Sequence, residues 1–346
     1  MFEITTLIDM QNMVPLNNEG RNSSVYIFTD PQLGAEFIMK KIDKSTITNI
    51  DEMFNESKIL YEVRHPNIIE IQYASYDDNN IFIVMPRCKN GSMQALLNQR
   101  FLTVREILKY SLEFLTGLHY VHAHKLIHYD IKPTNVLINN SGRAVLTDFG
   151  LAKYTDDLGL ATQECTYISE MPPEKYLSTK TNFKCDIYQA GLTMYRMCNG
   201  NDIWKEQLEQ VKSELKDAIS NGEFPNRKLY LPHIPLQLRK VINKCIEVNP
   251  DDRYNSVLEV INALSVIDNN LDWKYSKEID KESWTRIGLT GKNYEVIECK
   301  QEGNTFRIRG RKINIESKKG SNVSKWAYSS TEKDAVIKKL VTFLKE

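Results

Sequence analysis

A short polar run places the strongest constraint on this chain. His128-Tyr129-Asp130-Ile131-Lys132-Pro133-Thr134-Asn135 puts a carboxylate, an ammonium and an amide within six residues. Thirteen residues after Asn135, the apolar segment Ala144-Val145-Leu146 leads into Asp148-Phe149-Gly150, which adds a second carboxylate. A metal-assisted transfer to a hydroxyl group needs such a set. One carboxylate takes or orients the hydroxyl proton, oxygen ligands hold Mg²⁺, and the ammonium offsets the charge of the moving group.

In this order and spacing, the two motifs resemble the catalytic loop and the Asp-Phe-Gly motif of eukaryotic-type (Hanks-type) Ser/Thr protein kinases. The resemblance covers about residues 15–268. It implies an α+β, two-lobed fold, in which a small antiparallel β lobe with one helix (about 15–85) precedes a larger helical lobe (about 89–268). It also implies an enzyme that uses ATP and Mg²⁺, with Mn²⁺ as an alternative ion, to phosphorylate Ser or Thr hydroxyls of protein substrates.

The resemblance assigns a role to each matching residue. Asp130 and Lys132 match the catalytic aspartate and lysine, and Asn135 and Asp148 match the two metal ligands. The remaining nucleotide-binding positions are expected at Gly20, Val25, Lys40, Glu56, Met85, Cys88 and Leu137. Among these, Lys40 matches the lysine that holds the α- and β-phosphates, and Glu56 matches its partner on the following helix.

Further matches concern the framework of the site. Glu174 and Arg253 should form an ion pair, and Asp186 should begin the helix that anchors the catalytic loop. A hydrophobic column that links the lobes is expected from Leu60, Ile71, His128 and Phe149.

Three positions depart from the family pattern. The loop expected over the phosphates, residues 18–25, keeps one glycine of three, and Ile38 replaces a small alanine above the adenine. Tyr129 replaces the arginine that normally neutralises a phosphate on the activation segment, so we expect activity without phosphorylation of that segment. The same departures keep a second hypothesis open, a pseudokinase scaffold that acts by binding proteins.

The apolar pattern gives the expected elements. Short β-prone runs lie at residues 25–28, 36–40 and 81–85, and helical spacing covers residues 53–63. Helical spacing then predicts one helix over 104–121 with Thr103 as its N-cap, a single helix over 204–219, and two more over 238–246 and 257–267.

The last part of the chain differs in composition. Residues 271–346 hold 17 Lys+Arg and 11 Asp+Glu, a net charge of +6, whereas the whole chain is neutral. We therefore expect an N-terminal extension (1–14), a kinase domain (15–268) and a basic β-rich C-terminal module (271–346) that ends in a helix. Alternating strands are expected around 294–298 and 306–309.

A basic cluster stands out in residues 300–325 of this module. Its members are Lys300, Arg307, Arg309, Arg311, Lys312, Lys318, Lys319 and Lys325, and the aromatic residues Phe306, Trp326 and Tyr328 are interleaved with or follow them. Two interpretations remain open. The cluster binds an anionic partner (nucleic acid, phospholipid or an acidic protein face), or it is the solvated face of a small sheet. A nucleic-acid-binding tail that directs a kinase is therefore a third hypothesis.

Composition excludes several other classes. With 41% hydrophobic and 26% charged residues the chain is neither wholly disordered nor fibrous. No apolar run is long enough to cross a bilayer, the N-terminus lacks a secretory signal, and the six scattered cysteines indicate a reducing compartment. We therefore expect a cytoplasmic protein. The histidines other than His128, which include His124 and His233, are expected at the surface or as caps; the sequence gives no indication of oligomeric state.

Overall fold

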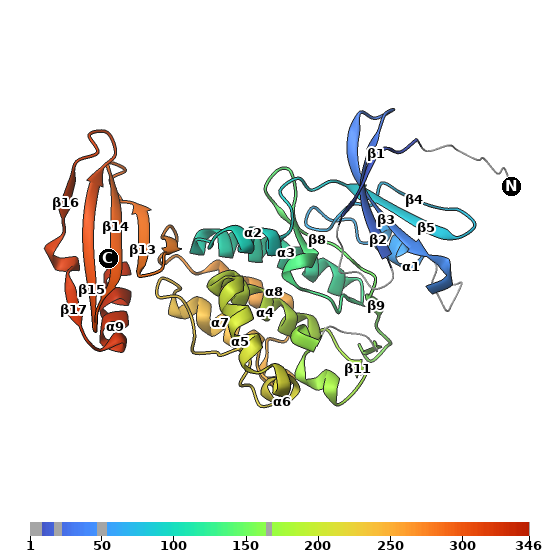
Figure 1. Ribbon diagram of the computed structural model, residues 1–346. Coiled ribbons are helices and arrows are strands. Elements are labelled where there is room, and N and C mark those ends of the chain that lie inside the picture. Colours follow the sequence, from blue (N-terminus) through green and yellow to red (C-terminus); the bar gives the residue numbers. More distant parts are fainter. Residues whose placement is uncertain (1–8, 17–22, 47–53, 164–167, 346) are drawn as a thin grey trace.

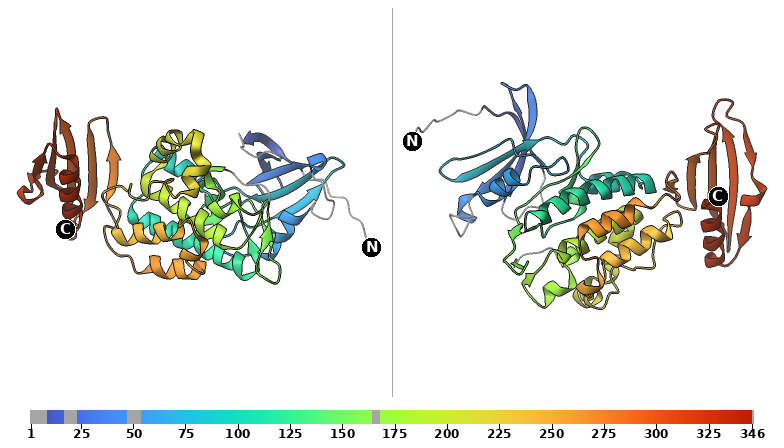
Figure 2. Two further views of the ribbon diagram at one scale, coloured as in Figure 1. Left: turned by 90° about the horizontal axis from the view of Figure 1, so that it is seen from below. Right: turned by 180° about the vertical axis from the view of Figure 1, so that it is seen from behind.

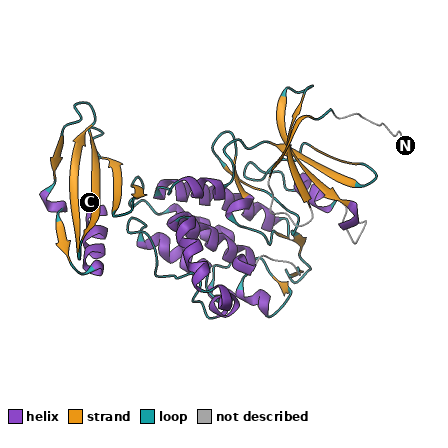
Figure 3. Ribbon diagram, viewed as in Figure 1, coloured by secondary structure: helices purple, strands orange, loops and turns teal. Residues whose placement is uncertain are grey.

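The computed structural model describes residues 9–16, 23–46, 54–163 and 168–345. Figure 1 shows two sheets at opposite ends of the molecule with a helical body between them. The chain passes from the N-terminal sheet through the helical body to the C-terminal sheet, and Figure 3 shows the same division by element type. In the described part, no helix is both long and apolar enough to cross a membrane.

The N-terminal sheet is antiparallel and has the strand order β1-β2-β3-β5-β4. The N-terminal lobe contains β1 (Gln11–Leu16), β2 (Ser23–Asp30), β3 (Ala35–Asp43), β4 (Tyr73–Tyr76), β5 (Asn80–Pro86) and the helix α1 (Asn55–Glu62). The sheet begins at Gln11, before the domain start predicted at residue 15. Pairing of β1 with β2 brings these residues into the sheet although their side chains, including the apolar Met13, Val14 and Leu16, are exposed.

The helical lobe contains α2 to α8 and several two- or three-residue strands. The helices are α2 (Met93–Gln99), α3 (Val104–Ala123), α4 (Lys184–Asn199), α5 (Asn201–Gln210), α6 (Leu215–Ser220), α7 (Leu236–Cys245) and α8 (Val257–Ser265). The short strands are β6 (Leu126–Ile127), β7 (Val136–Ile138), β8 (Ala144–Leu146), β9 (Lys153–Tyr154), β10 (Ala161–Thr162) and β11 (Lys180–Thr181). The predicted two-lobed α+β architecture is therefore confirmed.

Two helical predictions have different outcomes. Thr103 caps α3 as predicted, because its side chain accepts the N–H of Glu106 while Glu106 accepts the N–H of Thr103. The single helix predicted over 204–219 is wrong: a 3₁₀ turn at Lys212–Glu214 separates α5 from α6. Apolar residues continue on both sides of this turn, so periodicity alone does not register the break.

The C-terminal sheet has the order β12-β13-β14-β15-β16, and β17 also pairs with β15. Its elements are β12 (Lys274–Lys277), β13 (Lys281–Ile287), β14 (Asn293–Glu302), β15 (Thr305–Asn314), β16 (Gly320–Asn322), β17 (Tyr328–Ser330) and the closing helix α9 (Lys333–Leu344). The face that α9 covers buries Trp284, Ile297 and Ile308. Gly310 lies on this face because a Cβ there would overlap Trp326.

The C-terminal sheet packs against the helical lobe through aromatic rings. Tyr275 lies against Phe101 (centroids 4.6 Å apart), His233 (5.8 Å) and Trp284 (5.1 Å). Trp284 Nε1 donates to His233 Nδ1 at 3.3 Å. His233 is completely buried, so its predicted surface position is wrong. The sequence does not indicate this burial, because it depends on the docking of a sheet that begins only at Lys274.

The docking contact makes stability depend on pH. Burial lowers the pKa of His233 from 6.5 to about 3, so this side chain is neutral in the folded protein. The stability that a neutral His233 contributes is complete above pH 6.5 and is lost as pH falls from 6.5 towards 3. We predict that His233→Gln removes about 2 kcal/mol of the decrease in unfolding free energy between pH 6.5 and 4.5. Denaturant titrations measure this slope.

The matched control is His124→Gln, because His124 is exposed. Its pH dependence should equal that of the parent chain. An unchanged slope in His233→Gln would contradict the assignment.

Candidate active site

The catalytic loop is anchored by one buried carboxylate. Asp186, in the first turn of α4, is completely buried and accepts the backbone N–H groups of His128 and Tyr129, each at 2.8 Å. His122 Nε2 lies 2.8 Å from the same carboxylate. These contacts confirm the predicted anchoring position of Asp186 and fix the backbone immediately before Asp130.

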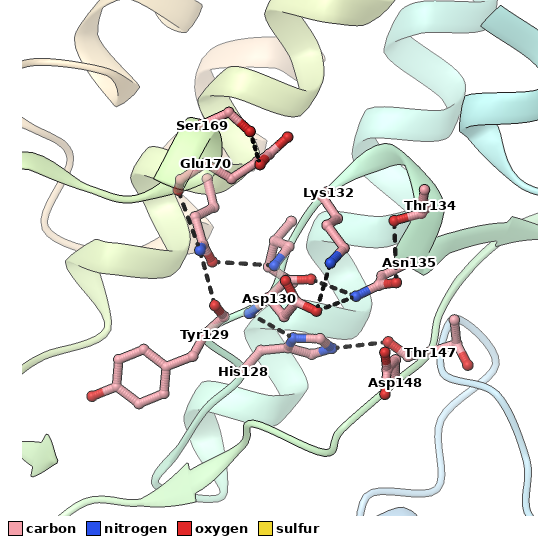
Figure 4. Close-up of polar contacts among 12 residues, drawn as sticks. His128, Tyr129, Asp130, Lys132, Thr134, Asn135, Thr147, Asp148, Ser169 and Glu170 are labelled. Atoms are coloured by element: carbon pink, nitrogen blue, oxygen red, sulfur yellow. Dashed lines mark hydrogen bonds and ion pairs between the residues drawn. The ribbon is translucent and has the colours of Figure 1, made fainter. Parts of the chain in front are cut away.

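The side chains of Lys132 and Asn135 both contact Asp130 in the catalytic loop, as Figure 4 shows. Lys132 Nζ lies 3.0 Å from Asp130 Oδ2, and Asn135 Nδ2 donates to the same oxygen at 2.8 Å. Asn135 Nδ2 also donates to the Asp130 carbonyl at 2.9 Å. The loop therefore closes on itself, and the amide orientation points Asn135 Oδ1 away from Asp130.

A second cluster joins the two lobes. Lys40 on β3 places Nζ 2.8 Å from Glu56 Oε2 on α1 and 2.8 Å from Asp148 Oδ1. Lys40 and Asp148 are 108 positions apart in the sequence. This cluster sets α1 and the Asp148 segment relative to the N-terminal sheet.

The charges in the site are tuned by burial and by each other. Burial opposes the charge on Lys40, but the carboxylates of Glu56 and Asp148 outweigh it and raise the Lys40 pKa above 10.5. Burial likewise acts to raise the pKa of Asp148, but Lys40 outweighs it and holds that pKa below 3.8. Burial raises the pKa of Asp130 above 3.8 although Lys132 opposes the shift. At neutral pH, Lys40 is therefore protonated and Asp148 ionised, while Asp130 is a stronger base than an exposed aspartate.

A cavity of about 680 Å³ opens between the lobes, a volume suited to a small ligand. Its wall includes nearly all described residues predicted to bind nucleotide or metal or to act in catalysis: Val25, Lys40, Glu56, Met85, Cys88, Lys132, Asn135, Leu137 and Asp148. Asp130 lies just outside this wall and is held to it by Lys132 and Asn135. Gly20 lies outside the described residues.

The oxygen donors at the cavity suit a hard divalent cation. Mg²⁺ binds oxygen and usually takes one or two carboxylates together with substrate phosphates. Asp148 uses Oδ1 for Lys40, and its side chain is 43% exposed towards the cavity, whereas Asn135 presents an amide oxygen from the other wall. This donor set fits Mg²⁺ held jointly with a nucleotide.

The predicted framework contacts are also present. Arg253 Nη2 lies 2.6 Å from Glu174 Oε2, which confirms that ion pair. Leu60, Ile71, His128 and Phe149 are all buried, and the rings of His128 and Phe149 are 4.6 Å apart.

Several residues that shape the site were not predicted from the sequence, among them Ile69, Thr147 and Gln189. Ile69 and Thr147 line the cavity, and Gln189 bridges the loop by accepting the N–H of Ile131 and donating to the Tyr129 carbonyl. Thr147 directly precedes Asp148, and Gln189 follows Asp186 by one helical turn, so motif position could have found both. Ile69 gave no signal of its own.

The C-terminal basic cluster contains some cations that are paired with carboxylates and others that are not, among the residues that the structure describes. Four of its cations pair with carboxylates: Lys300 with Asp280 (3.3 Å), Arg307 with Glu302 (2.9 Å), Arg311 with Glu298 (2.8 Å) and Lys312 with Glu295 (2.9 Å). The aromatic residues do not share a face with the arginines. By strand alternation Phe306 and Tyr328 lie on the face that α9 covers, and Trp326 packs against Gly310 there.

The chain is similar in sequence to known protein kinases. A family model described as "Protein kinase domain" matches residues 18–264. The chain is 31% identical over 205 residues to "Mitogen-activated protein kinase kinase kinase 1b" of Physcomitrium patens, covering 59% of this chain and 26% of the relative. It is 26% identical over 272 residues to "3-phosphoinositide-dependent protein kinase 1" of Arabidopsis thaliana, covering 74% and 54%.

A bacterial relative is similar to the same degree. A probable serine/threonine-protein kinase of Clostridium acetobutylicum is 26% identical over 274 residues, covering 78% of this chain and 40% of the relative. The chain thus spans about half, or less, of the length of these relatives. The match to the family model extends over most of the chain and contains every catalytic-loop contact described above, so the chain belongs to the protein kinase domain family.

Proposed function

We propose that this chain transfers a phosphoryl group from ATP to Ser or Thr hydroxyls of protein substrates. The observation that carries the proposal is the Lys40 cluster, in which one ammonium contacts Glu56 and Asp148 at the edge of the interlobe cavity. A surface ion pair would contribute little, whereas Lys40 and Glu56 are largely buried and Asp148 faces the cavity. Taking charges out of water is costly, and such charge clusters beside a cavity are characteristic of functional sites.

The proposed roles follow from position and charge. Lys40 holds the α- and β-phosphates, and Asn135 and Asp148 hold Mg²⁺, or Mn²⁺ as an alternative ion with the same oxygen ligands. When bound, ATP·Mg²⁺ supplies the transferable phosphoryl group. Val25, Met85, Cys88 and Leu137 bound the nucleotide, and the proposed role of Gly20 over the phosphates stays a prediction.

Two residues act on the acceptor. Asp130 orients the substrate hydroxyl and accepts its proton, which its raised pKa favours. Lys132, 3.0 Å from Asp130, stabilises the charge of the transferred group. Catalysis then rests on positioning and electrostatics, with no covalent intermediate on the protein.

We also propose that activity does not require phosphorylation of the activation segment. Tyr129 Oη donates to the Ala161 carbonyl at 3.0 Å and lies 3.2 Å from Thr181 Oγ1, and these two residues pair β10 with β11. The ammonium of Lys175 lies 4.9 Å from the centre of the Tyr129 ring. Neutral hydrogen bonds and a cation–π contact thus support the segment where a phosphate–arginine pair is usual in the family.

The first prediction concerns the catalytic carboxylates. Asp130→Asn and Asp148→Asn should each lower kcat at least about a hundredfold, because each removes a charge needed in the transition state. Transfer of radiolabel from ATP to a generic protein substrate measures this. Asp202→Asn, an exposed change on α5, is the matched control and should keep full activity. Retained transfer in either site variant would contradict the proposal, and ATP binding without transfer in the parent chain would favour the pseudokinase scaffold.

The second prediction uses the pH dependence of the rate. Protonated Asp130 cannot accept the hydroxyl proton, so kcat falls as pH decreases through the Asp130 pKa. Because Lys132 lowers that pKa, Lys132→Met should move the acidic limb of the kcat–pH profile to higher pH as well as lowering its plateau. Lys180→Met, which removes a partner of Asp156 instead, should leave the limb in place. A limb that does not move would show that Asp130 is not the group that titrates.

The third prediction separates Tyr129 from phosphorylation. Phosphatase treatment should leave the kcat of the parent chain unchanged. Tyr129→Phe should lower kcat about three- to tenfold, since it removes one buried hydrogen bond that orders the segment. Loss of activity on phosphatase treatment of the parent chain would overturn this part of the proposal.

A further inference from the structure

The end of the C-terminal sheet carries three lysines that have no carboxylate within ion-pair distance among the residues that the structure describes. Two neighbouring turns, residues 288–292 between β13 and β14 and residues 315–319 between β15 and β16, form this end, which we call the sheet tip. They lie side by side because Asn293 pairs with Asn314 and the Ile315 N–H donates to the Lys292 carbonyl at 3.0 Å. The sheet tip is at the opposite end of β15 from its pairing with β17.

The sheet tip has a net positive charge, and its lysines are exposed to solvent. Lys292, Lys318 and Lys319 are exposed, and in the described part of the chain none of them has a carboxylate within ion-pair distance. Glu316 is the single acidic residue of the two turns. Carboxylates already lie beside the paired cations Lys300, Arg307, Arg311 and Lys312. An external anion is therefore attracted more strongly by the unpaired lysines of the tip.

Aliphatic side chains accompany these lysines. Leu289, in the same turn as Lys292, is 97% exposed, and Ile287 at the end of β13 is 58% exposed. Tyr294, opposite Ile287 in the ladder, is 37% exposed. Exposed single aliphatic residues are common. Here two of them and a tyrosine lie beside three unpaired lysines, which is the combination of apolar and cationic side chains that binds the interfacial region of a membrane.

The composition of the tip distinguishes between anionic partners. Single-stranded nucleic acid is bound by stacking successive bases on several aromatic rings. Phe306, Trp326 and Tyr328 lie on the face towards α9, which leaves Tyr294 as the aromatic ring beside the sheet tip. An aliphatic side chain gains nothing against a phosphodiester backbone, whereas it is stabilised in the interfacial region of a bilayer, and tyrosine also favours that region.

We propose that the sheet tip binds the surface of an anionic lipid bilayer. Leu289 and Ile287 enter the interfacial region, and Lys292, Lys318 and Lys319 contact lipid phosphates and carboxylates. The views in Figures 1 and 2 place the C-terminal sheet at one end of the molecule, with the helical lobe between it and the N-terminal sheet. Such a contact leaves the interlobe cavity open, so it brings the proposed kinase to a surface without covering its site.

Vesicle co-sedimentation of the full chain tests the proposal. The chain should sediment with vesicles of phosphatidylcholine mixed with phosphatidylserine and not with phosphatidylcholine alone, and added salt should weaken binding. Lys318→Gln with Lys319→Gln should lower the affinity about 25-fold, because each lysine near an anionic surface contributes about a fivefold factor. Leu289→Ser should lower it independently of salt.

The control keeps the same change in net charge. Lys338→Gln with Lys345→Gln removes two exposed lysines from α9 and the residue after it, and should leave vesicle binding unchanged. Equal loss in both double variants, or no sedimentation of the parent chain, would overturn the proposal. Binding of labelled RNA that depends on Lys318 and Lys319, without vesicle binding, would overturn it in favour of a nucleic-acid partner. The thermal midpoint of each variant verifies that it is folded.

Discussion

The carboxylate of Asp186 is the contact on which the catalytic loop depends. A fully buried charge is costly unless hydrogen bonds satisfy it, and here two backbone N–H groups and His122 do so. Because those N–H groups belong to His128 and Tyr129, the helical core determines where the loop begins. Gln189, one turn further along α4, holds the loop on the other side of Asp130. One helix therefore fixes the position of the proposed base.

The site combines this rigid loop with strain at two residues. Tyr129 (φ 65°) and Asp148 (φ 62°) both occupy the left-handed region that side chains with a Cβ rarely adopt. Such conformations cost of order 1 kcal/mol or more and persist where the surroundings hold them. Asp186 holds Tyr129 through its N–H, and Lys40 holds Asp148 through its carboxylate. The first turn directly precedes Asp130, and the second places Asp148 in the cavity wall.

The sequence was informative where chemistry depends on short spacing. Asp130, Lys132 and Asn135 lie on one loop, so their contacts could be expected from the run itself, and the Thr103 cap needs only the residue three positions later. It was uninformative where the outcome depends on docking. Every side chain of strand β1 is exposed, so no buried face marks it, and the break after Gln210 occurs within a continuing apolar pattern. The environment of His233 is set by a sheet that begins at Lys274. The split of the basic cluster likewise depends on cross-strand register, which composition does not determine.

The C-terminal sheet and the helical lobe share one apolar core, since Tyr275 and Trp284 pack with residues of that lobe.

The central claim is that the interlobe site phosphorylates proteins, and phosphosite mapping tests it most directly. A phosphate-free peptide library incubated with the chain, ATP and Mg²⁺ would be analysed by mass spectrometry. The account predicts phosphate on Ser and Thr side chains that appears only when nucleotide and metal are both present. No phosphorylated peptide, or phosphate on tyrosine alone, would contradict it.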